Sequence, residues 1–236
     1  MGFTVVVLCG GFGNRFKTSG TPVKKPLINV HGHSQLFWSI KSTLLTYAPD
    51  KIILGVRSDL IADVGLEIEF LNDLGVQVEI VNVGASTNGP AETTARTLVG
   101  SKKLSSKDAI IVADNDCFNL FDNSVNLLFP FVSITESKNP AHCFVEITSN
   151  LQVQSFHEKQ IVGKYAVSGN YGFKNQSRFF ESYEKNRGKQ REYYLSDIMT
   201  DVLKVCPVNV VKTREYFSFG TPEEIANVGS KILSYL

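Results

Sequence analysis

The sequence predicts an α/β fold built on a mixed, mostly parallel β-sheet with helices on both faces and a small antiparallel insertion. Two observations predict it. Short β-branched runs alternate with helical patterns in the first half of the chain, and strand-like and helical segments are mixed in the second half. The chain has 236 residues, of which 43% are hydrophobic, and this is enough to bury a large core. No internal repeat or Gly/Ser linker divides it.

The expected elements follow from residue type and spacing. In the first half, short apolar runs rich in β-branched residues predict buried strands at 4–8, 51–56, 76–81 and 109–113. Helical patterns lie between them at 35–47, 63–74 and 91–99. In the second half, strands are expected at 141–146, 151–156 and 165–173, and helices at 177–185, 195–204 and 222–235. For the last helix, Thr221 suits the N-cap and Pro222 the first turn.

Composition excludes several classes of protein. Lys and Arg number 24 and Asp and Glu 23, so the net charge of +1 gives no bias toward nucleic acid or an anionic membrane. No apolar stretch approaches the roughly 18 residues of a membrane span, and the N-terminus lacks the basic region of a signal peptide. Four scattered cysteines without a C-x-x-C pair are expected to be reduced and buried. The sequence therefore predicts a cytoplasmic protein that needs neither nucleic acid nor membrane.

The strongest local signal is the run G-G-F-G-N-R at residues 10–15, directly after the first expected strand. Glycines let a backbone approach phosphate closely, and successive N–H groups can bind an anion. The run is neither the dinucleotide fingerprint nor a Walker A loop. Arg15 follows the glycines and Lys25 lies ten residues on, so two cations accompany the loop, as a triphosphate with a pyrophosphate leaving group requires. The alternative is a simple tight turn.

Two acidic residues end a strongly apolar run in the sequence A-D-N-D at residues 113–116. The carboxyl ends of strands in a parallel sheet line the ligand crevice. Carboxylates at such a place commonly hold Mg²⁺, which takes one or two of them together with phosphate oxygens. The alternative is a polar strand end in which Asp114 or Asn115 caps the next turn.

Six short motifs, in order, resemble those of the sugar-phosphate nucleotidylyltransferases, also called nucleotide-sugar pyrophosphorylases, in their capsule and polysaccharide branch. The resemblance covers residue 4 to about residue 226. Each motif is weak alone, but their order is specific to the superfamily and not to one substrate. The matching segments are the glycine run 10–15, K-P-L-I-N-V-H-G at 25–32, G-P-A-E-T at 89–93, Asp116, the E-K pair at 158–159 with the strand at 165–173, and F-G-T-P-E-E at 219–224.

The resemblance implies a Rossmann-like three-layer sandwich of the nucleotide-diphospho-sugar transferase type. It implies a single nucleotidyltransferase domain over 1–236, with a nucleotide-binding part at 1–120 and a sugar-phosphate-binding part at 121–236. It also implies the roles of individual residues: Arg15 and Lys25 are catalytic and contact the phosphates, Leu8, Gly10, Gly11, Gly13, Asn88 and Gly89 bind the nucleotide, Asp116 and Asp114 bind Mg²⁺, and Glu158, Lys159, Gly169 and Asn170 bind the phosphorylated acceptor.

One departure from the family pattern concerns the metal. Where the family usually has a second magnesium-binding aspartate, two residues before the closing Gly-Thr, this chain has Ser218. A neutral hydroxyl is a much poorer Mg²⁺ ligand than a carboxylate. Three explanations stay open: one carboxylate suffices with water and phosphate, Asp114 or Glu192 compensates, or catalysis is impaired. The four histidines lack metal-ligand spacing, and no catalytic role is assigned to them.

The reaction implied by the resemblance couples an NTP to a sugar 1-phosphate, or to a similar phosphorylated small molecule, and gives an NDP-sugar and pyrophosphate. An acceptor phosphate is already a nucleophile at neutral pH, so positioning and charge neutralisation suffice. Two alternatives are a metal-dependent glycosyltransferase that uses Asp114-Asn115-Asp116 as a D-x-D motif, and a non-catalytic homologue that binds nucleotide sugars. The nucleobase, the acceptor and any homo-oligomeric state stay open.

Overall fold

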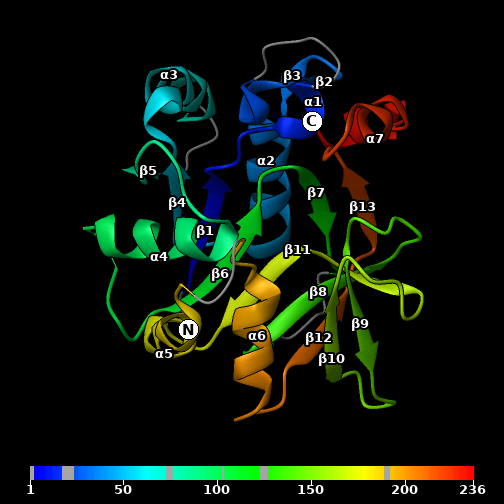
Figure 1. Ribbon diagram of the computed structural model, residues 1–236. Coiled ribbons are helices and arrows are strands. Elements are labelled where there is room, and N and C mark those ends of the chain that lie inside the picture. Colours follow the sequence, from blue (N-terminus) through cyan, green and yellow to red (C-terminus); the bar gives the residue numbers. More distant parts are fainter. Residues whose placement is uncertain (1–2, 18–23, 73–76, 103, 123–126, 189–191) are drawn as a thin grey trace.

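The computed structural model describes residues 3–17, 24–72, 77–102, 104–122, 127–188 and 192–236. Within these ranges, a nine-stranded sheet runs through the molecule in the order β10-β9-β11-β6-β1-β4-β5, with β8 paired to β11 and β12 paired to β8 (Figure 1). The strands of the first half are parallel, and β11 runs antiparallel to β6, β8 and β9. The sheet is therefore mixed, as the sequence predicts.

The first half forms the parallel part of the sheet. β1 lies between β4 and β6, and its residues are almost wholly buried because helices cover both faces. The predicted strands and helices of this half are confirmed, with ends that differ by at most two residues where the structure describes them. Residues 73–74 of the helix expected at 63–74 and residue 76 of the strand expected at 76–81 lie outside the described residues. Their bounds are β1 (Phe3–Cys9), α2 (Gln35–Tyr47), β4 (Lys51–Val56), α3 (Ile61–Asn72), β5 (Val78–Asn82), α4 (Pro90–Gly100) and β6 (Ala109–Asp114).

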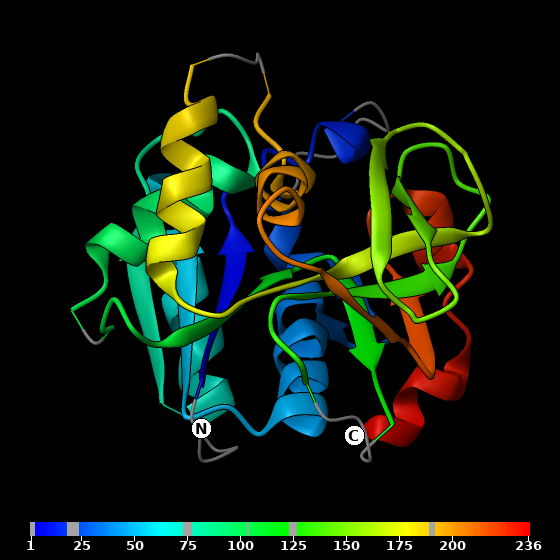
Figure 2. The ribbon, with the colours of Figure 1, turned by 90° about the horizontal axis from the view of Figure 1, so that it is seen from below.

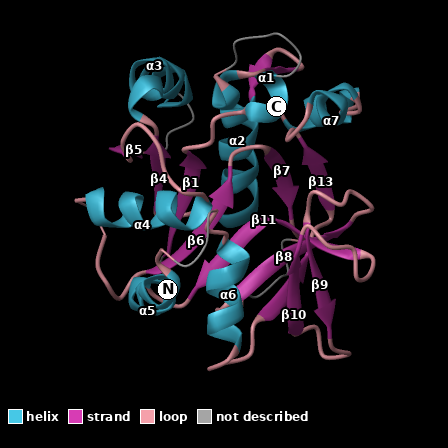
Figure 3. Cartoon of the chain, viewed as in Figure 1, coloured by secondary structure: helices cyan, strands magenta, loops and turns pink. Residues whose placement is uncertain are grey.

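Alternating side chains of β1 enter two separate cores. Val5 and Val7 belong to a core with Trp38 of α2, whereas Val6 belongs to a second core with Ala95 of α4. The second core also includes side chains of α5 and α6. Helices thus cover both faces of the sheet, and the predicted three-layer arrangement is confirmed (Figure 3).

The second half adds strands that pair antiparallel, apart from β12, which is parallel to β8, and it adds the helices α5 and α6 against the sheet (Figure 2). The strands and helices predicted between 141 and 204 are confirmed, whereas β8 and β12 were not expected. Their bounds are β8 (Phe131–Glu136), β9 (Cys143–Ile147), β10 (Val153–Glu158), β11 (Tyr165–Phe173), α5 (Gln176–Asn186), α6 (Leu195–Leu203) and β12 (Asn209–Lys212).

Short elements complete the fold. β7 pairs with β13 and β2 pairs with β3 in two small antiparallel sheets, and α1 follows the glycine run. None of these was expected from the sequence. Their bounds are α1 (Asn14–Lys17), β2 (Asn29–Val30), β3 (His33–Ser34), β7 (Cys117–Leu120) and β13 (Glu215–Ser218).

The prediction of one helix over 222–235 is wrong. Thr221 caps α7 (Pro222–Ala226) as expected, because its Oγ1 accepts a hydrogen bond from the Glu224 amide at 3.1 Å. The chain then turns, Gly229 is extended, and a 3₁₀ helix follows at Ser230–Tyr235. The break leaves the Val228 carbonyl to pair with His31 Nε2 at 2.6 Å, and both Val228 and Ile232 become buried. Tertiary contacts therefore outweigh helical continuation here.

The expectation of buried, reduced cysteines holds for three of the four. All four cysteines are free, and Cys9, Cys117 and Cys143 are buried, whereas Cys206 is half-buried. None of the helices in the described ranges combines the length and the apolar character needed to cross a bilayer.

Candidate active site

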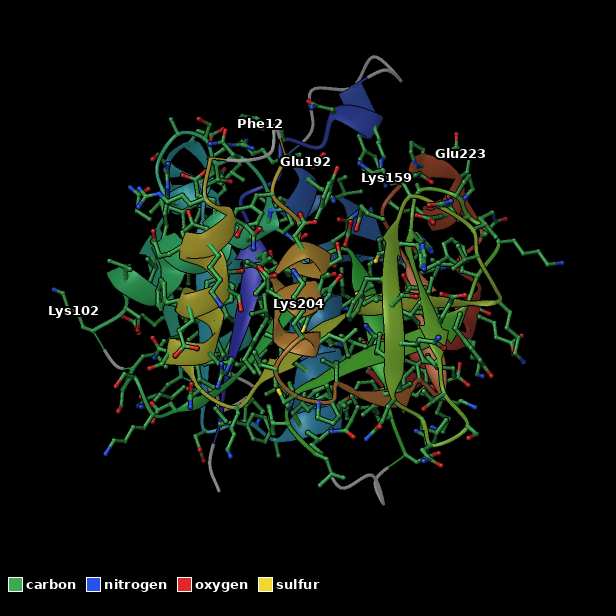
Figure 4. All side chains as sticks on the ribbon, turned by 60° about the horizontal axis from the view of Figure 1, so that its bottom comes forward. Phe12, Lys102, Lys159, Glu192, Lys204 and Glu223 are labelled. Atoms are coloured by element: carbon green, nitrogen blue, oxygen red, sulfur yellow. The ribbon has the colours of Figure 1, made fainter. Side chains whose placement is uncertain are left out.

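Two adjoining cavities lie beyond the carboxyl ends of β1 and β6, where ligands bind in open α/β sheets. The larger has a volume of about 570 Å³ and the smaller about 170 Å³. Figure 4 shows Phe12, Glu192 and Lys159 at this end of the molecule. The two cavities share one wall, which consists of Arg15, Pro90, Asp114, Asp116, Tyr194 and Gly220.

The larger cavity is formed by loops that follow strands of the parallel part of the sheet. At Gly10, a Cβ would lie 2.8 Å from Thr93 Oγ1, so a side chain would displace the start of α4. Gly13 has a φ of +63°, which glycine adopts without strain. The six residues expected to bind nucleotide all line this cavity: Leu8, Gly10, Gly11, Gly13, Asn88 and Gly89.

Position 89 requires glycine for two structural reasons. Its φ is +127°, and a Cβ there would lie 2.7 Å from the Tyr193 carbonyl oxygen. Tyr193 N–H donates to the Asn88 carbonyl at 2.7 Å, and Ala91 N–H donates to the Tyr193 carbonyl at 3.0 Å. The segment before α6 is therefore hydrogen-bonded to the segment before α4, and only glycine permits this close approach.

The expected catalytic cations meet the expected metal carboxylate at the shared wall. Lys25 Nζ donates to Asp116 Oδ2 at 2.6 Å. Arg15 lines both cavities, and its Nη1 and Asp116 Oδ2 lie 3.6 Å and 3.4 Å from the point where a Gly220 Cβ would stand. Although burial acts to raise the pKa of Asp116, Lys25 and Arg15 outweigh it and the pKa is lowered. Asp116 is therefore held as a carboxylate.

Asp114 also faces both cavities, in a different electrostatic state. Burial, followed by repulsion from Asp116, raises the pKa of Asp114 to about 7. Two carboxylates on one wall are a donor set that suits Mg²⁺, which takes one or two carboxylates and completes its shell with water and phosphate. Among the described residues, no three His, Cys, Asp or Glu side chains form a group that could hold a metal unaided. Substrate phosphates would therefore have to share in binding the ion.

Side chains from several strands and helices form the smaller cavity. Glu158, at the end of β10, accepts a hydrogen bond from Ser196 Oγ at 2.7 Å, and burial raises the pKa of Glu158. Gly169 lines this cavity and has a φ of +95°; a Cβ there would lie 2.9 Å from Cys117 Sγ. Glycine is therefore required by the backbone and by its close neighbour.

Two residues expected to bind the acceptor lie outside both cavities. Asn170 is buried in β11, where its backbone N–H donates to Ser133 Oγ at 3.1 Å. Lys159 donates to the Tyr194 hydroxyl, lies 4.7 Å from the centre of that ring, and approaches Glu192 Oε2 at 3.5 Å. Lys159 therefore contacts Tyr194 of the shared wall and Glu192 of the larger cavity, and the sequence motif alone did not reveal these partners.

Sequence reasoning missed Glu224, which lines the smaller cavity with Ser218 and His142. Asn139 Nδ2 donates to Glu224 Oε1 at 2.9 Å, and His142 Nε2 lies 3.5 Å from the same atom. Burial acts to raise the pKa of Glu224, but hydrogen bonds from His142, Ser218 and Asn139 outweigh it and lower the pKa to about 2. Glu224 Oε2 lies 3.0 Å from the Cβ point of Gly220. A carboxylate thus lies beside Ser218, although not at its position.

The comparison with protein families is decisive. The model of the nucleotidyl transferase family matches residues 4–232. The chain belongs to this family. It is a nucleotidyltransferase, and the predicted resemblance is confirmed at the level of the family.

Solved structures support the same fold at low identity. A nucleoside-diphosphate-sugar pyrophosphorylase from Vibrio cholerae RC9 is 20% identical, with a TM-score of 0.81 over 95% of this chain and 98% of that one. The inositol-1-phosphate CTP transferase from T. maritima is 16% identical, with a TM-score of 0.76 over 99% and 94%. A UTP-bound UGPase from Acinetobacter baumannii is 15% identical, with a TM-score of 0.73 over 100% and 93%. No curated protein matches the sequence.

Proposed function

We propose that this nucleotidyltransferase couples an NTP to a sugar 1-phosphate, or to a similar phosphorylated small molecule, and releases pyrophosphate. The observation that carries the proposal is the wall between the two cavities. It brings Arg15 and Asp116 together, with Lys25 bound to Asp116, between a glycine-lined cavity and a smaller one rich in side chains. The larger cavity suits the NTP and the smaller one suits the acceptor.

The chemistry requires positioning and charge stabilisation. A phosphate oxygen of the acceptor attacks the α-phosphorus of the NTP, a P–O bond forms, and the bond to pyrophosphate breaks in line with it. Arg15 and Lys25 stabilise the negative charge on the phosphate oxygens. The Lys25 ammonium has three donors and uses one on Asp116, so others can reach a phosphate. Since the acceptor phosphate is ionised at neutral pH, no general base is needed.

Asp116 and Asp114 are the residues that would hold Mg²⁺. Bound there, the ion would neutralise phosphate charge and polarise the α-phosphoryl group. Burial and the neighbouring Asp116 raise the pKa of Asp114, and a divalent ion at this wall would favour the ionised form of both carboxylates. Glu192 lines the larger cavity but is bonded to Tyr194, so Asp114 is the better candidate to compensate for Ser218.

The acceptor site favours a compact group that carries hydroxyls. The smaller cavity has a volume of about 170 Å³, and its Glu158 and Glu224 carboxylates can accept hydrogen bonds from hydroxyl groups. We assign the acceptor phosphate to the side of this cavity nearest Arg15, with Lys159 supporting the site through Tyr194 and Asn170 supporting it from β11. An NTP-dependent reaction of this kind suits the cytoplasm and a role in polysaccharide precursor synthesis. The UTP and CTP named for the relatives leave the nucleobase of this protein open.

A pyrophosphate-release assay tests the proposal. The purified protein is incubated with Mg²⁺, each common NTP and a panel of sugar 1-phosphates and other phosphorylated acceptors. We expect release with at least one pair, and a fall of about 10²–10³-fold in kcat for Arg15→Ala, comparable with loss of one preorganised donor. Asp116→Asn is expected to abolish the Mg²⁺-dependent release of pyrophosphate.

The control variant is Arg178→Ala. Arg178 pairs with Glu181 on the exposed face of α5 and lines neither cavity. It should keep wild-type activity. If no pair in the panel yields pyrophosphate, or if Arg15→Ala behaves like Arg178→Ala, the proposed function is wrong. Hydrolysis of an NDP-sugar without use of any NTP would instead favour the D-x-D glycosyltransferase.

A further inference from the structure

Arg57 is a buried cation that the reaction described above does not use. It follows β4 directly, beside the carboxyl end of β1, and is only 7% exposed. Burying a charge is costly unless it is paired and hydrogen-bonded, so its contacts indicate what the residue does. Its guanidinium reaches the glycine run that lines the larger cavity.

Three contacts hold Arg57 between a carboxylate and the glycine run. Its Nε and Nη2 donate to the two carboxylate oxygens of Asp59 at 2.5 and 2.8 Å, which is a bidentate pair. Its Nη1 donates to the Gly11 carbonyl at 2.8 Å. Its Cζ lies 4.4 Å from the ring centre of Phe12, within the range of a cation–π interaction. The guanidinium plane is thus fixed on one edge and binds the loop with the other.

The bond to Gly11 constrains the loop where it is most flexible. Three of the four residues from Gly10 to Gly13 are glycines, which have the largest backbone freedom to lose. A trans peptide places its C=O and the following N–H on opposite edges of one plane. Fixing the Gly11 carbonyl therefore also fixes the direction of the Phe12 N–H. Both residues line the larger cavity, and Phe12 remains 39% exposed there.

We propose that Arg57 is a positioning residue for the nucleotide: it holds the glycine run, through the Gly11 carbonyl and the Phe12 ring, in the shape that binds the NTP. Asp59 in turn holds Arg57. The inference rests on the proposed function, because it assigns the larger cavity to the NTP. Arg57 touches neither the acceptor cavity nor the wall that carries Arg15 and Asp116. It should therefore affect NTP binding and leave acceptor binding unchanged.

Two measurements on the full chain test this proposal. Hydrogen–deuterium exchange without nucleotide should show faster exchange over residues 10–16 in Arg57→Ala, and over no other part of the larger cavity. Steady-state kinetics with the NTP that the wild type uses should show a KM for NTP raised about tenfold or more, as loss of a hydrogen bond to a charged group predicts. The kcat and the acceptor KM should change less than about threefold, because the side chains that bind the acceptor and the reacting phosphates are unchanged.

Further variants separate positioning from a loss of folding. Arg57→Lys keeps the positive charge but loses the planar guanidinium that binds Asp59 and Gly11 at the same time. We therefore expect a KM for NTP between those of the wild type and Arg57→Ala. Asp59→Asn leaves Arg57 in place but loosens it, and we expect a KM increase of about threefold. Arg178→Ala is again the control and should match the wild type in both measurements.

The outcomes are distinct. Wild-type exchange over residues 10–16 in Arg57→Ala, or an unchanged KM for NTP, would overturn the inference while the proposed function stands. A fall in kcat without a change in the KM for NTP would also overturn it. That result is expected when residues of the shared wall are changed, and not when the glycine run is loosened. Failure of the wild type to use any NTP overturns the proposed function first, and this inference with it.

Discussion

The two cavities are built in opposite ways. Most residues that line the larger come from two short contiguous segments, 8–16 at the end of β1 and after it, and 87–93 before α4 and at its start, and these segments include Gly10, Gly11, Gly13 and Gly89. The smaller is lined by residues from elements spread over the whole chain, namely α1, α4, β6, β7, β9, β10, β11, α6, β13 and α7, and from loops between them. A site of the first kind leaves a motif in the sequence, because its spacing is local. A site of the second kind exists only after the strands have paired.

Arginines outside the larger cavity hold its loops. Arg57 binds Gly11, and Arg96 Nη1 donates to the carbonyls of Val83 and Ser86 at 2.8 and 3.0 Å. The smaller cavity instead depends on buried carboxylates and their donors, such as Glu158 with Ser196. Nucleotide affinity should therefore respond to loop tethers, and acceptor affinity to single charged side chains.

The largest expected effect is at Lys25, which is bonded to Asp116 in the wall that both cavities share. Lys25→Ala should lower kcat by about 10²–10³-fold, because it removes a cation from the phosphates and leaves Asp116 without its ion-pair partner. Pyrophosphate release measures the effect. The matched control is Lys24→Ala, since Lys24 pairs with Asp63 at 2.6 Å and lines neither cavity. Equal loss in both variants would contradict a specific role for Lys25.

A smaller effect should separate the two cavities. Glu158→Gln replaces an acceptor of hydrogen bonds in the smaller cavity by a neutral amide, so the KM for the acceptor should rise about tenfold or more. The KM for NTP should change less than about threefold. Glu146→Gln on β9 is the control, because Glu146 is exposed and bonded to Ser155 and His157. A parallel rise of both KM values in Glu158→Gln would show that the cavities are not independent.

The smallest effect concerns acid stability. The pKa of Glu224 is lowered to about 2 in the folded chain from an ordinary value near 4.5, so the unfolded chain binds more protons between these values. The stability that Glu224 contributes is present above about pH 4.5 and is lost as the pH falls toward 2. Denaturation midpoints measured over this interval should fall less steeply in Glu224→Gln than in the wild type. Glu223→Gln, at an exposed neighbouring position, should retain the wild-type slope.

Much of the parallel half could be predicted, and the reasons are local. β1, β4 and β6 are buried on both faces and therefore show as apolar runs, and α2 has the bounds that its pattern predicts. The six nucleotide-side residues line the larger cavity because they share two loops. Their functional roles stay predictions that the variants above test.

The rest depends on contacts that sequence spacing does not encode. β7 and β13 are about 95 residues apart and become strands by pairing, with Ser218 opposite Cys117. Glu224 lies in the F-G-T-P-E-E segment, which carries no binding role in the sequence pattern, but Asn139 and His142 bond to its carboxylate in the smaller cavity. The prediction of a helix over 222–235 is wrong because of a similar distant contact: His31 binds the Val228 carbonyl where that helix would have continued.

The two hydrogen bonds between Tyr193 and the Asn88–Ala91 segment have a consequence for attempts to change the substrate specificity. Tyr193 bonds to both sides of Gly89, so the chain leading into α6 is fastened to the nucleotide side like an added strand. A chimera that imports a relative's acceptor half must keep this fastening in register. If the graft shifts these hydrogen bonds by one residue, Tyr194 leaves the wall that the larger and smaller cavities share. The NTP and the acceptor are then no longer held together for the reaction.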